Sequence, residues 1–196
     1  MRPSQGSRLE RLDAEHDLFK FDSGNDELDG WLQRHGLAAQ QMDSARTFVL
    51  VEQDRVVGYF SLTMGSVLRQ DAPAKLVRGL PAYPVGMVLL ARLAVDRSEQ
   101  GIGLGATLLA EALRKAVAAG DAAAARLVVV DAIDEDAAFF YECHGFIPAP
   151  DNPLRLYRRM KDIAASLETS KRLRATATWR TGRPGTGSGS TSNPTW

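Results

Sequence analysis

The glycine-rich turn Gln100–Gly105, with the sequence QGIGLG, is the segment of this chain best suited to hold an anion. It follows the apolar run Val88–Val95 and opens the helix-like run Leu104–Ala119. Glycines let the backbone approach a ligand closely, and the first N–H groups of a helix point outward at the positive end of its macrodipole. The order of strand, glycine turn and helix therefore predicts a phosphate-binding site.

Two common phosphate-binding loops do not fit this turn. No Gly-Lys-Ser/Thr follows the glycines, so the turn is not the P-loop of a nucleoside triphosphatase. No Gly-x-Gly-x-x-Gly follows a strand near the N-terminus, which disfavours a dinucleotide-binding fold. On the glycines alone, a turn without any ligand is the alternative.

A second segment, Ala137–Phe146, predicts a short helix rich in aromatic residues. The helix should begin after Asp134, with acidic residues in its first turn, and end at Gly145. The β-branched run Leu127–Val130 before it is typical of a buried strand. Tyr141 within the helix is protonated at neutral pH, because its reference pKa is about 10, and can donate a proton. The alternative is a tyrosine that only packs in the core.

Together the two segments resemble the cofactor site of the GCN5-related N-acetyltransferases, the GNAT family. Gln100–Gly105 matches that family's pyrophosphate loop, Gln/Arg-x-x-Gly-x-Gly/Ala, and Phe140–Phe146 matches its F-Y-x-x-x-G-F sequence. The resemblance implies acetyl-CoA as the co-substrate, no metal, and Tyr141 as the general acid at the sulfur of acetyl-CoA. It implies cofactor contacts at Leu93, Ala94, Val95, Gln100, Gly101, Ile102, Gly103, Leu104, Gly105 and Ala106.

The strand before the turn resembles the place where the family splays its sheet and binds the pantetheine arm through backbone groups. A backbone N–H at Leu93 is expected to stabilise the developing oxyanion. One departure is Gln100, where many relatives carry arginine, so a charge near the pyrophosphate is lost unless Arg97 substitutes.

The same strand, Val88–Val95, contains no Asp or Glu and offers no carboxylate base. A lysine acceptor, with a pKa of about 10.4, would be almost wholly protonated and would need such a base. An α-amino group titrates at about 7.7–8.0 and is already partly neutral. The strand therefore favours an α-amine acceptor, although a base elsewhere or a chain of waters is an alternative.

Four further segments resemble one subfamily, the acetyltransferase toxins of bacterial toxin–antitoxin pairs. They are Phe21–Gly24, Leu28–Leu32, Arg46–Val49 and Gly58–Leu62, and the resemblance extends from about Leu9 to Ile163. It implies acetylation of the α-amine of aminoacyl-tRNA, inhibition of translation, and neutralisation by an antitoxin of the ribbon-helix-helix type. Trp31 and Leu32 are expected to pack in the core.

A tRNA acceptor needs cations that contact phosphates, and we expect these at Arg92, Arg158 and Arg159. The sequence shows no large basic patch, which a homodimer would repair by pooling the charge of two subunits. An N-acetyltransferase of a small-molecule amine is the alternative enzyme, and an acyl-CoA-binding regulator is the alternative without catalysis.

The remaining patterns predict an α/β fold, a mixed sheet with helices on both faces, arranged β–α–β around the glycine turn. The resemblance implies a mostly antiparallel GNAT sheet with splayed central strands. The expected elements are an amphipathic helix over Asp26–Gln41, strands over Thr47–Glu52, Val56–Leu62, Val85–Val95, Arg126–Asp131 and Leu154–Met160, a helix over Leu104–Ala119, and the short helix that carries Tyr141.

With 196 residues the chain is long enough for one well-buried domain, which we place at residues 1–167. Residues 168–196 are rich in Gly, Ser, Thr and Pro with isolated cations, so they are expected to form a disordered basic tail. Cys143 is the only cysteine and is expected to be packed and inert. No stretch suits a membrane span or a signal peptide, so we expect a cytoplasmic protein.

Overall fold

The computed structural model describes residues 6–80 and 82–180, and in this part of the chain seven strands form one sheet. They are β1 (Arg8–Arg11), β2 (Arg46–Glu52), β3 (Arg55–Val67), β4 (Val85–Val95), β5 (Leu127–Asp131), β6 (Ile147–Pro148) and β7 (Arg155–Arg159). Their order across the sheet is β1-β2-β3-β4-β5-β7-β6. Neighbouring strands are antiparallel except β4 and β5, which are parallel. The predicted mixed, mostly antiparallel sheet is confirmed.

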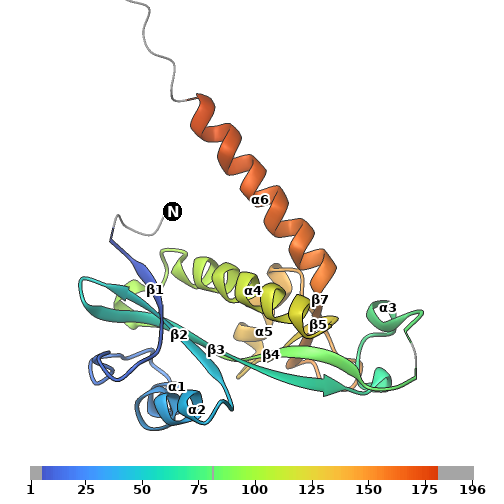
Figure 1. The fold of residues 1–196 in the computed structure, drawn as a ribbon, viewed down its shortest axis with the longest axis horizontal. Helices are drawn as coiled ribbons and strands as arrows, with labels where there is room; N and C mark the ends of the chain where they lie inside the picture. Colours follow the sequence, from blue (N-terminus) through green and yellow to red (C-terminus); the bar gives the residue numbers. More distant parts are fainter. Residues whose placement is uncertain (1–5, 81, 181–196) are drawn as a thin grey trace, which may run out of the picture.

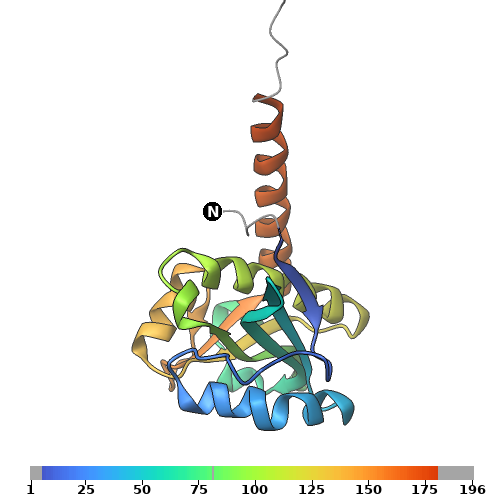
Figure 2. The same cartoon turned by 90° about the vertical axis from the view of Figure 1, so that its left-hand side faces the viewer.

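Helices lie on both faces of this sheet, as Figures 1 and 2 show. One face carries α4 (Leu104–Ala122), α5 (Glu135–Cys143) and the start of α6 (Met160–Arg180). The other face carries α1 (Asp26–Trp31), η1 (Leu32–Gly36), α2 (Leu37–Gln41) and α3 (Ala74–Val77). The two remaining short helices are η2 (Arg69–Asp71) and η3 (Arg97–Glu99).

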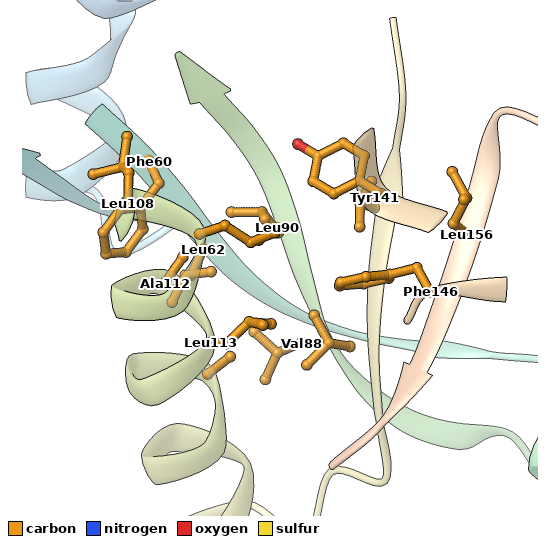
Figure 3. Close-up of a cluster of buried hydrophobic side chains, with 14 of the residues drawn as sticks. Phe60, Leu62, Val88, Leu90, Leu108, Ala112, Leu113, Tyr141, Phe146 and Leu156 are labelled. Atoms are coloured by element: carbon orange, nitrogen blue, oxygen red, sulfur yellow. The ribbon is translucent and has the colours of Figure 1, made fainter. Parts of the chain in front are cut away.

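The main core lies between α4 and the sheet. Its residues on α4 recur at helical spacing and are buried: Leu108, Leu109, Ala112, Leu113 and Ala116. They pack against apolar side chains of β3, β4 and β5, and α5 closes the far end of the cluster with Tyr141 (Figure 3). The core therefore joins the glycine turn, through α4, to the helix that carries the predicted acid.

The parallel pair β4 and β5 is joined over only part of its length. Met87–Leu90 pairs with Leu127–Val130, and beyond Leu90 no described strand pairs with that edge of β4. At the same point the register between β3 and β4 shifts, so that Ala91 is an extra residue on β4. Such a bulge increases the local twist of a strand. The predicted splay of the central strands is thus present beside Ala91–Val95.

The C-terminal segment differs from its prediction. Helix α6 continues to Arg180, so residues 168–180 are helical where we expected a disordered tail. The reason is local composition: this stretch contains no Gly or Pro, and it includes the strong helix formers Leu, Ala, Lys and Arg. Residues 181–196 lie outside the described residues, so the expected tail there stays a prediction, as does the domain boundary at 167.

Candidate functional site

The glycine turn has the geometry of an anion cradle. Gly101 and Gly103 have φ angles of 76° and 86°, in the left-handed region that favours glycine. Gly103 precedes α4, whose start has no side-chain cap. The N–H groups of the first helical residues, Leu104 to Ala106, therefore have no acceptor within the helix.

The space over the turn is open. A Cβ built at Gly101 or at Gly103 would meet no atom within 4 Å. At Gly105 it would lie 3.9 Å from the ring of Phe140, because α4 passes α5 at that residue. Unpaired N–H groups beside open space suit a pyrophosphate, so the residues present fit the predicted group.

Gln100 directs its amide nitrogen to neighbouring carbonyl groups and not to the open space over the glycine turn. Its Nε2 donates hydrogen bonds to the carbonyl oxygens of Val95 and Ser23, each at 2.8 Å. The carbonyl of Val95 lies at the end of β4, beyond its pairing with β5. The Gln100 amide thus connects the glycine turn to β4, through Val95, and to the loop before α1, through Ser23. Arg97, the expected substitute, lies with Nε 3.4 Å from Oδ1 of Asp22.

Asp96 is the centre of a second set of hydrogen bonds, which join the loop before α1 to the segment between β4 and the glycine turn. Its carboxylate accepts hydrogen bonds from the N–H of Asp22 at 3.2 Å and from the N–H of Ser98 at 3.0 Å. The Ser98 hydroxyl donates at 2.6 Å, and Nη1 of Arg55 lies 3.5 Å away. The N–H of Arg97 in turn donates to the carbonyl of Asp22 at 2.8 Å.

These bonds give a physical role to Phe21–Gly24, the first of the four segments that resemble the toxin subfamily. Residues Phe21–Gly24 had no chemistry of their own in the sequence, yet the structure places them against the start of the cofactor turn. Phe21 is buried, and its ring meets that of Tyr59 edge to face at 5.6 Å. The segment therefore supports the turn from the side of α1.

Tyr141 lies on α5, which Asp134 caps by accepting a hydrogen bond from the N–H of Ala137 at 2.7 Å. The Tyr141 side chain is packed edge-on between Phe140 and Phe146, with ring centroids at 5.3 and 5.6 Å. Figure 3 shows its ring between β4 and β5, with the oxygen on the β4 side. Burial raises the pKa of Tyr141, so the phenol keeps its proton at neutral pH.

The three cofactor residues of β4 lie on the splayed part of the strand. Leu93 and Val95 belong to the α4 face of the sheet, and Ala94 belongs to the α1 face. The edge of β4 that faces away from β3 has no strand partner here among the described residues. Backbone groups on this edge are therefore available to a ligand, as the prediction requires.

Arg92 projects from the same part of β4 towards α1. Its guanidinium carbon lies 4.2 Å from the ring centroid of Trp31, which stacks on Tyr59 at 6.2 Å with an interplanar angle of 12°. Within the described residues Arg92 makes no ion pair, so its charge is held in place without being neutralised. Leu32 is fully buried as predicted, and Trp31 is half-buried, packs against the same cluster as predicted, and also lies under the guanidinium group of Arg92.

Arg158 and Arg159 both reach the start of α6 with their guanidinium groups. Their side chains leave β7 in opposite directions, but the residues that they contact, Ser166 and Asp162, lie one turn apart on α6 and are linked by a hydrogen bond from the Ser166 hydroxyl to the Asp162 carbonyl at 2.8 Å. Nη2 of Arg158 donates to the Ser166 hydroxyl at 2.7 Å, and burial lowers the pKa of Arg158. Nε of Arg159 pairs with Oδ2 of Asp162 at 2.7 Å. Neither joins the cluster around Tyr141, and their tRNA contacts stay a prediction.

Three further observations bear on chemistry. Cys143 is exposed, which contradicts the expected packed position, because it lies at the solvent side of the last turn of α5. His144 does not pair with it, since its Nδ1 bonds to the carbonyl of Phe140 at 2.7 Å.

Over the described ranges no group of His, Cys, Asp and Glu could hold a metal ion, and no helix could span a membrane.

We predict that Asp96→Asn destabilises the fold at neutral pH. Burial alone would raise the pKa of Asp96, but the bonds from Ser98 and Asp22 and the charge of Arg55 outweigh it and lower the pKa. A carboxylate with a lowered folded-state pKa stabilises the fold above its unfolded pKa of about 3.9, and this contribution is lost as pH falls through the folded value. The loss at pH 7 should be about 1–3 kcal/mol.

Urea unfolding of both proteins at neutral pH and below about pH 4 measures this effect. Asp54→Asn is the control, because its side chain is 93% exposed and it adopts a positive φ that asparagine tolerates. The gap between wild type and Asp96→Asn should narrow in acid. A gap that is absent at neutral pH, or as large in acid, would contradict the role of the Asp96 charge.

Comparison with known proteins agrees with this geometry. The model of the acetyltransferase (GNAT) family matches residues 12–146. A protein of Mycobacterium tuberculosis described as a tRNA-acetylating toxin is 41% identical over 155 residues, 79% of this chain and 93% of that protein.

Two solved structures are also similar. AtaT complexed with acetyl-methionyl-tRNAfMet is 32% identical with a TM-score of 0.75, over 81% of this chain and 98% of that one. A Tyr→Phe mutant of the AtaT toxin, bound to the C-terminus of the antitoxin AtaR and acetyl-CoA, is 32% identical with a TM-score of 0.71, over 83% and 98%. The chain therefore belongs to the GNAT family of acetyltransferases.

Proposed function

We propose that this chain is a toxin that transfers an acetyl group from acetyl-CoA to the α-amine of an aminoacyl-tRNA. The observation that carries the proposal is the position of Tyr141, a protonated phenol between the splayed strands β4 and β5, with the glycine turn at the start of the adjacent helix α4. The similarity to a tRNA-acetylating toxin over most of both chains supports the choice of acceptor.

The cofactor site is built from backbone groups. In the proposal, N–H groups from Gly101 to Ala106 bind the pyrophosphate at the start of α4. The free edge of β4 from Leu93 to Val95 binds the pantetheine arm, and Gln100 holds the two parts in register through Val95. Acetyl-CoA supplies an acetyl group already activated as a thioester.

Two groups of the chain then serve the reaction. As the neutral amine attacks the carbonyl carbon, the N–H of Leu93 stabilises the negative charge that grows on the carbonyl oxygen. When the carbon–sulfur bond breaks, Tyr141 donates its proton to the departing thiolate. The new ammonium loses a proton to solvent, and the Tyr141 phenolate takes one back from solvent, which restores the acid. Tyrosine has a reference pKa of about 10 and burial raises the pKa of Tyr141, so the phenol holds the proton that the leaving thiolate needs at neutral pH.

The acceptor site favours an α-amine. The strand β4 carries no carboxylate, and Asp96, the first acidic residue after it, is engaged by Ser98, Asp22 and Arg55. On the α1 face of the same strand, Arg92 offers an unneutralised charge for a phosphate near the acceptor end. An acetylated α-amine has lost its nucleophilic lone pair, so the aminoacyl group cannot form a peptide bond.

The proposal extends to regulation and assembly. An antitoxin would hold the enzyme inactive, as suggested by the AtaT structure that contains the C-terminus of AtaR. We place the enzyme in the cytoplasm with a ribbon-helix-helix antitoxin, and a homodimer would pool its cations. We also retain residues 1–167 as the acetyltransferase domain and 168–196 as an appendage to it.

One observation favours the alternative, a small-molecule amine. Residues 1–159 carry 18 Lys and Arg against 22 Asp and Glu, which suits a cationic amine better than a polyanion. Transfer of labelled acetyl separates the two readings, because an RNase-sensitive product points to tRNA and a resistant one to a metabolite.

The test of the main proposal is brief expression in bacteria, followed by mass spectrometry of the amino acids linked to tRNA. We expect growth arrest with an N-acetylated aminoacyl-tRNA. Tyr141→Phe is the control, since it removes only the phenolic proton and should slow turnover by about 10²–10⁴ while it retains acetyl-CoA binding. Arrest without acetylated tRNA, or an equally toxic Tyr141→Phe, would contradict the proposal.

A second prediction concerns the cradle. Gly103→Val should weaken acetyl-CoA binding at least about tenfold, because hydrogen bonds to charged groups contribute about 1.5–3 kcal/mol each. Gly79→Val is a matched control: its φ of 78° is close to the 86° of Gly103 and its surroundings are equally open, but it lies between α3 and β4. Calorimetry should show lowered affinity only for the first variant. Equal affinity in the two would remove the turn from the cofactor site.

A further inference from the structure

One stretch of the chain is basic, although the part of the chain that carries the site is acidic. Residues 1–159 carry 18 Lys and Arg against 22 Asp and Glu. Within them, residues 56–95 have one acidic residue, Asp71, and four cations: Arg69, Lys75, Arg78 and Arg92. A polyanion is attracted to such a stretch and repelled by the remainder. The positions of these cations in the fold therefore decide whether they can bind one ligand together.

Three of the four cations line a single hollow beside α3, which we call the α3 hollow. It has a volume of about 650 Å³, and its charged lining residues are Arg69, Lys75 and Arg78. No carboxylate is among the described residues that line it, since Asp71 lies outside the lining. In contrast, two cations and two carboxylates line the groove between α4 and α6. The α3 hollow is thus suited to an anion.

The cations of the α3 hollow are available to a ligand. Lys75 and Arg78 are exposed. Across residues 6–80 and 82–180 no ion pair joins either of them, or Arg69, to a carboxylate. Nη1 of Arg69 donates to the carbonyl of Leu80 at 2.7 Å. A guanidinium has five N–H donors, so this bond orients Arg69 and leaves donors for a phosphate.

The α3 hollow lies on the face of the sheet to which Arg92 projects. Helices α3 and α1 both cover this face, and Figure 1 shows them at opposite ends of the sheet. Between them Leu89 of β4 is only half-buried, so the face is not fully covered there. Val85 packs with α3, and the opening beside Tyr141 begins at Ala91. Over these six residues β4 rises about 20 Å.

A ligand that extends from the α3 hollow to this opening must be long and carry negative charge along its length. An aminoacyl-tRNA has both properties, because each nucleotide adds one phosphate behind the amine that is acetylated. Arg92 lies at the near end of this path and the α3 hollow lies at its far end. A small amine that occupies the opening cannot reach the hollow.

We propose that the α3 hollow binds the phosphate backbone of the tRNA whose aminoacyl end lies in the opening between β4 and β5. This inference rests on the proposed function. Arg92 contacts a phosphate near the acceptor end, and the α3 hollow contacts phosphates further along the chain. One face of the sheet thereby binds RNA although the catalytic part as a whole is acidic.

The test replaces two cations of the α3 hollow together in the full chain: Lys75→Gln and Arg78→Gln. Arg69 is kept, because its bond to Leu80 holds the loop that forms the hollow. Glutamine has nearly the helix propensity of lysine, so α3 should persist, and urea unfolding checks that stability is unchanged.

The matched control is the double variant Arg11→Gln and Arg126→Gln, which changes the net charge equally. Both side chains are exposed. Arg11 lies on the edge strand β1, and Arg126 lines a hollow beside α4 on the opposite face of the sheet. Acetylation of aminoacyl-tRNA is measured for each protein between about 50 and 200 mM salt.

We expect the variant of the α3 hollow to raise KM for aminoacyl-tRNA about tenfold or more, with kcat and acetyl-CoA affinity unchanged. The slope of log kcat/KM against log salt should become shallower by about one to two, because two phosphate contacts are lost. The control variant should keep the wild-type slope.

An unchanged KM and slope in the variant of the α3 hollow would overturn the inference while leaving the proposed function intact. An equal loss in the control variant would also overturn it, since only net charge would then matter. Loss of binding to a polyglutamate peptide, with tRNA kinetics intact, would assign the hollow to an acidic protein segment and overturn it too. Absence of tRNA acetylation by the wild type would instead overturn the proposed function, and this inference with it.

Discussion

The site depends on the early end of pairing between β4 and β5. Their ladder stops at Leu90 and Val130, and the extra residue Ala91 twists β4 away at that point. Backbone polar groups that lose a ladder partner must find another one or face a ligand. One carbonyl, that of Val95, is taken by Gln100 of the glycine turn, and the opening between the strands receives the phenol of Tyr141. A single interruption in one sheet therefore creates the cofactor edge and places the acid beside it.

The loops around the opening are held by bonds between distant parts of the chain. Asp96 and Gln100 bond to Asp22 and Ser23, more than seventy residues earlier in the sequence. On the other side, Phe140 of α5 lies against the start of α4 near Gly105. Because the turn is fixed from both sides, its N–H groups can be oriented before any ligand arrives, which lowers the entropic cost of binding.

Local patterns predicted the elements that carry the chemistry. The strand Val85–Val95, the turn and the helix after it follow from hydrophobic spacing and glycine, and the cap at Asp134 marked the helix of Tyr141. The family motifs added the splay, which spacing alone does not reveal. The contacts of Arg158 and Arg159 with the start of α6 depend on how that helix packs after β7, which the spacing of residues does not reveal.

Other features depend on tertiary contacts and could not be read from the chain. The platform that Trp31 provides for Arg92 joins α1 to β4, and the role of Phe21–Gly24 appears only once the loops meet. The helical continuation of α6 was missed because the Gly-rich residues after Arg180 dominated the composition of the whole segment.

The central claim is that acetyl-CoA binds along the free edge of β4 and over the glycine turn. Amide hydrogen exchange with and without acetyl-CoA tests this claim most directly. The account predicts slower exchange, by about tenfold or more, within Ala91–Val95 and Gly101–Ala106, with the hairpin turn at Gln53 and Asp54 unaffected. Protection that spares both segments, or that falls instead on the groove between α4 and α6, would contradict it.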